Sequence, residues 1–350
     1  MEPSIHDVSF QSQGGASARA TAVIDVVAYD PGWPNAATGT NGLRGAGCGG
    51  VIVCMATELS IPDPSELDDV VGTLRSWQRD EAPIQLHPGD LGWHWRFGAD
   101  ELASTVRTWS RNGEICAIGF LDGPDVLRMT VAPEVWLDDE LAHDVVTDLS
   151  APERGVLPAG KVSVEVPDST RIQDLLSEYA WTAGDPWTPL HLGLTGRVAQ
   201  TDPRIEVVDS AEQVSECTAV HRSAWGSEGF TDEKWYAMAD GSPFAEARCL
   251  LGRDDQGIAV ATVTVWAAGP GRPGLLEPLG VHANHRRRGY GAAICMAAAA
   301  ALRELGSSSA LVCTPSSLQS AVRTYEAAGF ETRSERLDRT RDATTKPLLP

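Results

Sequence analysis

The spacing of apolar residues in the second half of the chain alternates between the strand period of two and a helical period of about 3.6 residues. Ser210 and Gln213 have the separation of a capping box, so a helix is predicted from Ser210 to about Trp225. Apolar runs on both sides of the turn "DDQG" predict a hairpin, and strands and helices alternate after it. These further elements are expected at 205–210, 230–239, 246–253, 258–268, 274–282, 291–305, 309–314, 317–329 and from Phe330 onward.

The first half repeats this order more weakly. Ser65 and Asp68 resemble a capping box that opens a helix over 65–80. Because the apolar residues of "IQDLLSEYAW" and "VRTYEAAGF" have similar spacing, we infer an internal duplication. A hairpin, a helix, a strand and a helix are expected at 114–121 with 126–133, 137–149, 161–166 and 170–181.

The duplication predicts two α/β (α+β) domains, each with a mixed, mainly antiparallel twisted sheet flanked by helices. We expect them at 55–200 and 205–340, followed by a tail at 341–350. Residues 1–54 hold glycine-rich pieces and no long amphipathic period, so we expect a leader that is disordered or that precedes the natural start at Met55. An extra strand from "TAVIDVVAY" is the alternative.

The charge of the chain limits its partners. With 28 basic and 48 acidic side chains, the net charge of −20 should repel nucleic acid and anionic lipid and favour cationic ligands. The seven cysteines include no CxxC pair, which disfavours a zinc site or a disulfide framework and fits a reducing cytoplasm. The N-terminus lacks the pattern of a signal peptide.

One short segment concentrates positive charge in this acidic chain. In "HRRRGYGAA", three arginines precede two glycines between a predicted strand and a predicted helix. Amides at a helix N-terminus lack partners, and Gly289 and Gly291 allow a ligand to approach the backbone. This pattern favours a pyrophosphate site, and the alternative is a solvated basic helix start. It is neither a dinucleotide fingerprint nor a P-loop, because "GxGxxG" and "GK[ST]" are absent.

Arg286-Arg287-Arg288-Gly289-Tyr290-Gly291 resembles the [QR]-x-x-G-x-[GA] motif of the GCN5-related N-acetyltransferases. The downstream helix with Ala321, Tyr325, Gly329 and Phe330 is similar to a second motif of that family. The resemblance covers about 205–340, whereas 55–200 resembles only the architecture of a degenerate first half of a tandem protein. It implies two GNAT-like domains and acetyl-CoA as co-substrate, without a metal.

The resemblance also implies which residues hold the cofactor. Backbone groups of Leu279 and Val281 would pair with the pantetheine arm, and Pro278 in that strand suits an edge, a bulge or a splayed pair. Leu318 stands where the family often has an asparagine, so Ser317 or Gln319 would substitute for it. The turn would hold the pyrophosphate through Arg286, Arg287, Arg288, Gly289, Tyr290, Gly291 and Ala292.

Two residues are candidates for proton transfer. Tyr325 matches the family tyrosine that protonates the leaving thiolate, and the alternative is a ring that only packs in the core. Glu277 lies four residues before Val281, which predicts the same strand face and the role of base; the alternative is an ion pair with a nearby arginine. The segment from Trp225 to Tyr236, which includes Asp232, Glu233 and Trp235, is either an acceptor pocket or an ordinary amphipathic helix.

The resemblance implies acetyl-CoA-dependent N-acetyl transfer to a small amine by direct attack on the thioester. The excess of negative charge leads us to expect a cationic amine, and the protein is expected to be a monomer or a homodimer. Two alternatives stay open: a non-catalytic sensor that binds acyl-CoA, and an acyltransferase with a hydroxyl or thiol acceptor. Acetyl and longer acyl chains are not distinguished by the sequence.

Overall fold

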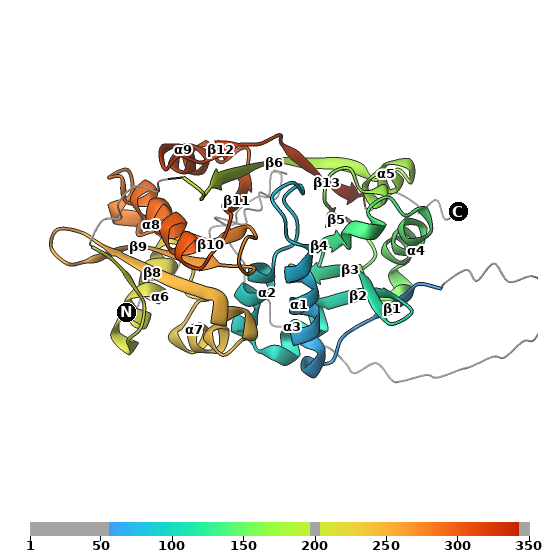
Figure 1. Cartoon of the computed structure of the whole chain (residues 1–350), viewed down its shortest axis with the longest axis horizontal. Coiled ribbons are helices and arrows are strands. Elements are labelled where there is room, and N and C mark those ends of the chain that lie inside the picture. The colour runs from blue at the N-terminus through green and yellow to red at the C-terminus, as the bar shows by residue number, and fades with distance from the viewer. Residues whose placement is uncertain (1–55, 197–203, 343–350) are drawn as a thin grey trace, which may run out of the picture.

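The computed structural model describes residues 56–196 and 204–342 (Figure 1). The predicted leader 1–54 and residues 343–350 of the predicted tail lie outside the described residues, as does the link at 197–203. The first half contains β1 (Glu58–Ser60), α1 (Leu67–Trp77), α2 (Pro88–His94), α3 (Ala99–Thr105), β2 (Val106–Arg111), β3 (Glu114–Leu121), β4 (Val126–Val131), α4 (Asp139–Ser150), β5 (Val162–Glu165), α5 (Arg171–Glu178) and β6 (Thr182–Gly193).

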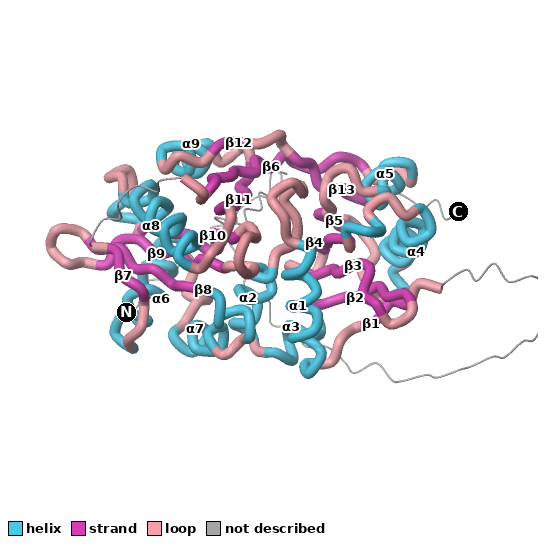
Figure 2. Tube along the Cα trace, in the orientation of Figure 1, coloured by secondary structure: helices cyan, strands magenta, loops and turns pink. Residues whose placement is uncertain are grey.

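The second half repeats this order almost element by element. It contains β7 (Ile205–Val207), α6 (Ala211–Trp225), α7 (Asp232–Ala239), β8 (Ala247–Arg253), β9 (Ala259–Trp266), β10 (Gly274–Val281), α8 (Tyr290–Glu304), β11 (Ser309–Pro315), α9 (Gln319–Ala327), β12 (Glu331–Thr332) and β13 (Arg336–Arg341). Figure 2 shows strands of the two halves at opposite ends of the molecule, with α1, α2 and α3 between them.

The two halves have the same sheet topology. Strands β1 to β5 are neighbours in chain order, and so are β7 to β11. Within each series the described strands pair antiparallel, except that the fourth and fifth strands, β4–β5 and β10–β11, pair parallel. The predicted fold class, a mixed and mainly antiparallel sheet with flanking helices, is therefore confirmed.

The last strands of the two halves join them into one sheet. β6 comes from the first half but pairs antiparallel with β11, with Ser309 opposite Gly193. β13 comes from the second half but pairs with β5, and it also lies against β6. The strand order is therefore β1-β2-β3-β4-β5-β13-β6-β11-β10-β9-β8-β7, so the predicted strand after Phe330 extends into the first half's sheet.

Most predicted elements are present, and one predicted helix start differs. Ser210 and Gln213 form the expected capping box at α6. In the helix predicted over 65–80, however, the capping box is made by Asp63 and Glu66, not by Ser65 and Asp68. Pro64 stands at the first helical position there, where its missing N–H costs nothing. No helix among residues 56–196 and 204–342 is long and apolar enough to cross a membrane.

The junction between the halves is closely packed. A Cβ atom on Gly89 or Gly92 of α2 would lie 2.5 or 2.4 Å from the Trp266 side chain of β9, so only glycine permits this contact. Next to it, the Trp93 ring lies 5.5 Å from the His221 ring and 4.8 Å from the Phe230 ring. The first half thus covers the strands of the second half on the sheet face where α6 and α7 lie.

Buried imidazoles in this junction make stability depend on pH. Burial is the main cause that lowers the pKa of His221 to about 3 and that of His87 to about 4. Both ring nitrogens of His221 lack a hydrogen-bond partner among the described residues. Because an unfolded histidine titrates near 6.5, only the unfolded state gains this proton as pH falls below that value. Stability contributed by the neutral rings is therefore present above about pH 6.5 and lost in acid.

We expect His221→Phe to weaken this acid sensitivity. The variant keeps an aromatic ring against Trp225 but cannot be protonated, so its stability relative to the parent should grow by about 1.4 kcal/mol per pH unit below 6.5. Urea unfolding at pH 7, 6 and 5 measures this difference. His143→Phe, in α4 where the side chain is 41% exposed, is the control. Parallel stability curves for His221→Phe and the parent would contradict the assignment.

Candidate active site

The arginine–glycine turn leads directly into α8. Gly289 is the N-cap residue of this helix and has a φ of 88°, a backbone conformation that favours glycine. A Cβ atom added there would have no neighbour within 4 Å, so the space in front of the helix N-terminus is open. Gly291 is needed for packing instead, since a Cβ there would lie 2.7 Å from Cγ2 of Thr324 in α9.

The three arginines have different environments. Nη2 of Arg286 donates a hydrogen bond of 2.6 Å to the carbonyl oxygen of Ala224, at the end of α6. This contact fixes the turn against the neighbouring helix. Arg287, with a φ of 62°, and Arg288 are exposed beside the helix N-terminus. Unpartnered amides, the helix dipole and these two guanidinium groups together fit a phosphate-bearing ligand.

The strand before the turn is irregular, as Pro278 predicts. The register of β10 against β9 shifts between Leu276 and Leu279. On its other side, β10 pairs with β11 only at Gly274–Ala310 and Leu275–Leu311. The backbone of Leu279 and Val281 therefore has no β11 partner within this ladder, which leaves its outer edge available to an extended ligand.

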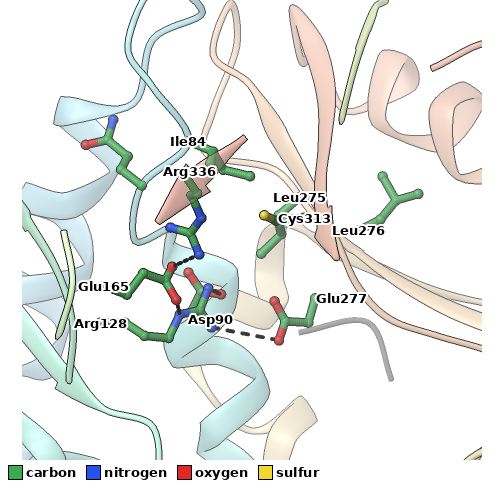
Figure 3. A pocket seen from close by; sticks show the side chains of 10 residues that line it. Ile84, Asp90, Arg128, Glu165, Leu275, Leu276, Glu277, Cys313 and Arg336 are labelled. Atoms are coloured by element: carbon green, nitrogen blue, oxygen red, sulfur yellow. Dashed lines mark ion pairs between the residues drawn. The ribbon is translucent and has the colours of Figure 1, made fainter. Parts of the chain in front are cut away.

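The bulge corrects one expectation. Counting four residues placed Glu277 and Val281 on the same face, but the extra residue in the bulge breaks the alternation. Val281 packs with the core beneath α8, together with Leu276 and Leu279. Glu277 instead points toward the first half, where it faces Asp90 and Arg128 (Figure 3).

Glu277 belongs to a buried cluster of charged groups that spans both halves. Arg128 is central: its Nη2 lies 2.9 Å from Oδ1 of Asp90, its Nε 3.3 Å from Oε2 of Glu165, and its Nη1 4.0 Å from Oε1 of Glu277. Nη2 of Arg336 lies 2.7 Å from Oε1 of Glu165 (Figure 3). All five side chains belong to residues that are at most 7% exposed.

The buried cluster contains three carboxyl groups and two guanidinium groups, and the partly exposed Asp122 adds a fourth carboxyl group 3.6 Å from Nη1 of Arg128, so carboxyl groups outnumber their counterions. Burial, then the negative charge of Asp90, raises the pKa of Glu277 well above its ordinary value. Burial raises the pKa of Asp90 as well, but Asp90 lies closer to Arg128 and accepts a 2.6 Å hydrogen bond from the His87 amide. We therefore assign the extra proton to Glu277.

The elements around Glu277 hold it in place. Nε1 of Trp266 donates a 2.5 Å hydrogen bond to the backbone oxygen of Glu277. His87, the N-cap of α2, accepts a hydrogen bond from the Gly89 amide, and its Nε2 lies 3.1 Å from the Pro273 oxygen just before β10. These contacts fix α2, and with it Asp90, against the strand that carries Glu277.

Tyr325 lies in α9 in the core beneath α8 and is only 2% exposed. Burial is the main cause that raises the pKa of its phenol well above the ordinary value, so the group keeps its proton. Cys313 of β11 is close enough to contribute to this shift, and burial raises the pKa of its own thiol to about 11. Ser317, the substitute expected for the family asparagine, is exposed just before α9.

The comparisons with known proteins agree with this geometry. Residues 212–330 match the model of the acetyltransferase (GNAT) family. These residues form a GNAT acetyltransferase domain. Among curated proteins, no relative matches the sequence of the chain. The family transfers acyl groups from acyl-CoA, so this GNAT domain implies acyl-CoA as co-substrate.

Solved structures share the fold over most of the chain. A GCN5-related N-acetyltransferase from Sphaerobacter thermophilus is 16% identical, with a TM-score of 0.50 over 82% of this chain and 96% of that chain. A tandem GNAT protein from the clavulanic acid biosynthesis pathway is 13% identical, with a TM-score of 0.50 over 82% and 99%. N-myristoyltransferase of Saccharomyces cerevisiae is 9% identical, with a TM-score of 0.50 over 83% and 79%. At these identities the similarity shows the fold.

The first half differs from the GNAT domain at the position that corresponds to the arginine–glycine turn before α8. The matching helix, α4, begins after Asp138, whose side chain accepts a 2.7 Å hydrogen bond from the Leu141 amide. Asp138 is in turn ion-paired to Arg111 at 3.0 Å, and Asp139 and Glu140 follow in the first turn. Carboxylates at this helix N-terminus disfavour a phosphate ligand, so the first half is degenerate at this position.

The aromatic segment after α6 does not form the cation pocket considered from the sequence. Trp225 stacks on His221 with ring centroids 4.1 Å apart. Trp235 is buried in the core with α6, whereas Tyr236 is 46% exposed. Asp232 accepts a short hydrogen bond from Thr218. These side chains pack an ordinary helix pair.

The first-half members of the charged cluster were missed by sequence reasoning. Asp90, Arg128 and Glu165 lie in α2, β4 and β5, and they meet Glu277 only because the halves pack together. In an acidic chain such isolated charges resemble surface residues. One sequence signal is a charge inside an apolar strand, as with Arg128 in "VLRMTV" and Glu165 in "VSVE".

Proposed function

We propose that the chain transfers the acetyl group of acetyl-CoA to a small amine, and that residues 205–340 carry the chemistry. The observation that supports this most strongly is the open N-terminus of α8, with Gly289 at the N-cap and exposed arginines beside it. The unpaired edge of β10 lies next to this turn and suits the extended arm of the co-substrate. Residues 55–200, in this proposal, do not bind a second acyl-CoA.

The residues have separate tasks in this proposal. Amides from Arg287 to Ala292 hold the pyrophosphate, and backbone groups of Leu279 and Val281 hold the pantetheine arm. Acyl-CoA supplies the thioester, and the amine attacks it directly. Glu277 accepts a proton from the amine, Tyr325 donates one to the departing sulfur, and a strand N–H stabilises the developing oxyanion. The net charge of −20 favours an amine that is protonated in solution.

Gly289→Val tests the co-substrate site. A valine side chain would fill the open space at the helix N-terminus, so affinity for acetyl-CoA should fall at least tenfold, or about 1.4 kcal/mol. Gly257→Val is the matched control, because Gly257 has a φ of 78° in the β8–β9 turn and carries a similar backbone penalty. Calorimetry that gives equal affinities for the two variants would show that acyl-CoA binds elsewhere.

Turnover assays distinguish an N-acetyltransferase from an acyl-CoA sensor and from an acyltransferase with a hydroxyl or thiol acceptor. Incubation with acetyl-CoA and a panel of amines should release CoA and yield products that are heavier by one acetyl group. The products should resist hydroxylamine, because amides do and esters or thioesters do not. Binding of acetyl-CoA without release of CoA would instead indicate a sensor, and hydroxylamine-sensitive products would indicate a hydroxyl or thiol acceptor.

A further inference from the structure

A cleft of about 440 Å³ lies between the two halves, on the opposite side of the sheet from α8. One wall is the loop 78–85 that follows α1, and the other is formed by β6, β11 and residues 333–336. Leu311 and its β6 partner His191 line the cleft, whereas the neighbouring residues Ala310 and Val312 pack beneath α8. The volume is that of a small-molecule site.

A second cavity next to the cleft reaches Glu277. This cavity is much smaller, about 10 Å³, and contains Glu277 and Cys313 in its wall. The two cavities share Ile84, Gln85 and Arg336 as lining residues, so they lie side by side. A ligand in the cleft and acyl-CoA at the α8 turn would thus approach the gap between β10 and β11 from opposite faces of the sheet.

Positively and negatively charged side chains line the two cavities. Arg336 is 5% exposed, and its Nε has no hydrogen-bond partner among the described residues, which leaves a buried donor for an oxygen atom of a ligand. The carboxyl group of Glu277, which lies farther from Arg128 than those of Asp90 and Glu165, lines the smaller cavity with Arg336. At the outer end, the exposed Arg79 and Arg333 line the cleft together with the acidic side chains of Asp80, Glu81 and Asp168.

We propose that this cleft binds the acceptor, and that the acceptor is a primary amine that also carries a carboxylate, of the size of an amino acid or a dipeptide. The amine would face Glu277, and the carboxylate would accept hydrogen bonds from Arg336 or from the outer arginines. Its walls include Pro83, Ile84, Pro189 and Leu190, which suit an apolar side chain between the two polar ends. The inference rests on the proposed function, because it assigns that reaction its acceptor.

The experiment compares matched probes. Free amino acids and dipeptides are assayed beside their C-terminal amides and beside amines of similar size without the carboxylate. We expect kcat/KM for the carboxylate forms to be at least tenfold higher. Equal rates for acids and amides would show that an uncharged oxygen suffices, and a preference for diamines would overturn the proposed class.

Variants test the location. Ile84→Trp should fill the neck of the cleft and lower kcat/KM for the preferred probe at least tenfold, with unchanged calorimetric affinity for acetyl-CoA. Arg336→Gln should raise KM for carboxylate probes more than for their amides; if it fails to fold, Arg333→Ala makes the same comparison at the outer end. Arg303→Ala, an exposed arginine of α8, is the control. Full activity of a folded Ile84→Trp variant would refute the assignment of the cleft as the acceptor site.

Binding is measured apart from turnover, so that the two proposals can fail separately. Calorimetry with the same amino acids and dipeptides should show binding to the parent and at least tenfold weaker binding to Ile84→Trp. Binding without any acetyl transfer would refute the proposed function and leave the cleft assignment intact. If the protein acetylates amines and Ile84→Trp does not change their binding, the proposed function stands and the cleft assignment is refuted. If no probe binds, the cleft assignment is also refuted.

Discussion

Replacing Tyr325 by phenylalanine should lower kcat for acetyl transfer by roughly 10²–10⁴-fold, the usual loss when a positioned proton donor is removed. The ring of Tyr325 is fully enclosed, and its centroid lies 5.9 Å from that of Phe330. Phenylalanine keeps this packing and removes only the hydroxyl group. The loss should therefore appear in kcat, while KM for acetyl-CoA changes little, because the proton is transferred only in the transition state.

The surroundings of Tyr325 raise the pKa of its phenol, and they would shift the pKa of a departing thiol in the same direction. Burial raises the pKa of the phenol, and it raises that of the nearby Cys313 thiol to about 11. A CoA sulfur that leaves within the same region would be desolvated in the same way, so its affinity for a proton would rise with that of the phenol. Proton transfer between the two groups thus stays feasible although both are weaker acids than in water.

The control for this variant is its stability and its acetyl-CoA affinity. Both should remain close to those of the parent, which separates a lost proton donor from a disturbed core. Turnover of Tyr325→Phe within a factor of three of the parent would assign the proton to water and leave Tyr325 a packing role. A large loss of acetyl-CoA affinity would instead indicate that the hydroxyl group contributes to binding.

Local sequence signals predicted the elements well because their causes are local. The capping box at Ser210 and the irregular strand at Pro278 each depend on residues within a few positions. The exchange of β6 and β13 between the halves could not be predicted in this way. Strand pairing depends on which distant edge is available, and the residues of a strand do not encode its partner.

The same limit applies to the candidate site. The turn from Arg286 to Gly291 is contiguous, so its motif could be recognised directly. Glu277 was also predicted as a site residue, because regular alternation would place it on the same strand face as Val281, but the bulge in β10 breaks that alternation. Its actual partners, Asp90 and Arg128, come from a half of the chain that lacks the motif. Their role arises from the packing of α2 on Trp266, which two isolated glycines permit.

Glu277→Gln should lower kcat/KM by roughly 10²–10⁴-fold if this carboxylate is the base. The pH dependence carries more information than the loss itself. Burial and the negative charges of Asp90 and Asp122 raise the pKa of Glu277, whereas the nearby Arg128 opposes the shift. Since the base acts only when deprotonated, activity of the parent should rise with pH through a pKa well above the ordinary glutamate value.

Asp90→Asn should move this rise toward lower pH. The substitution removes the negative charge that most strongly favours the protonated form of Glu277, and it leaves the positive charge of Arg128 in place. The titration of the amine acceptor is common to both proteins, so the difference between their pH profiles reports Glu277. Asp122→Asn, which removes a charge that contributes less to the pKa of Glu277, should produce a smaller shift in the same direction.

Infrared spectroscopy gives a readout that does not depend on turnover. At neutral pH the parent should show the carbonyl band of a protonated carboxyl group, and this band should be absent from Glu277→Gln and weaker in Asp90→Asn. If Asp90→Asn leaves both the band and the pH profile unchanged, the two carboxyl groups are not coupled and the proton lies elsewhere in the cluster. If Glu277→Gln retains full activity with an unchanged profile, another group or water is the base, and Glu277 serves only to balance the charge of Arg128.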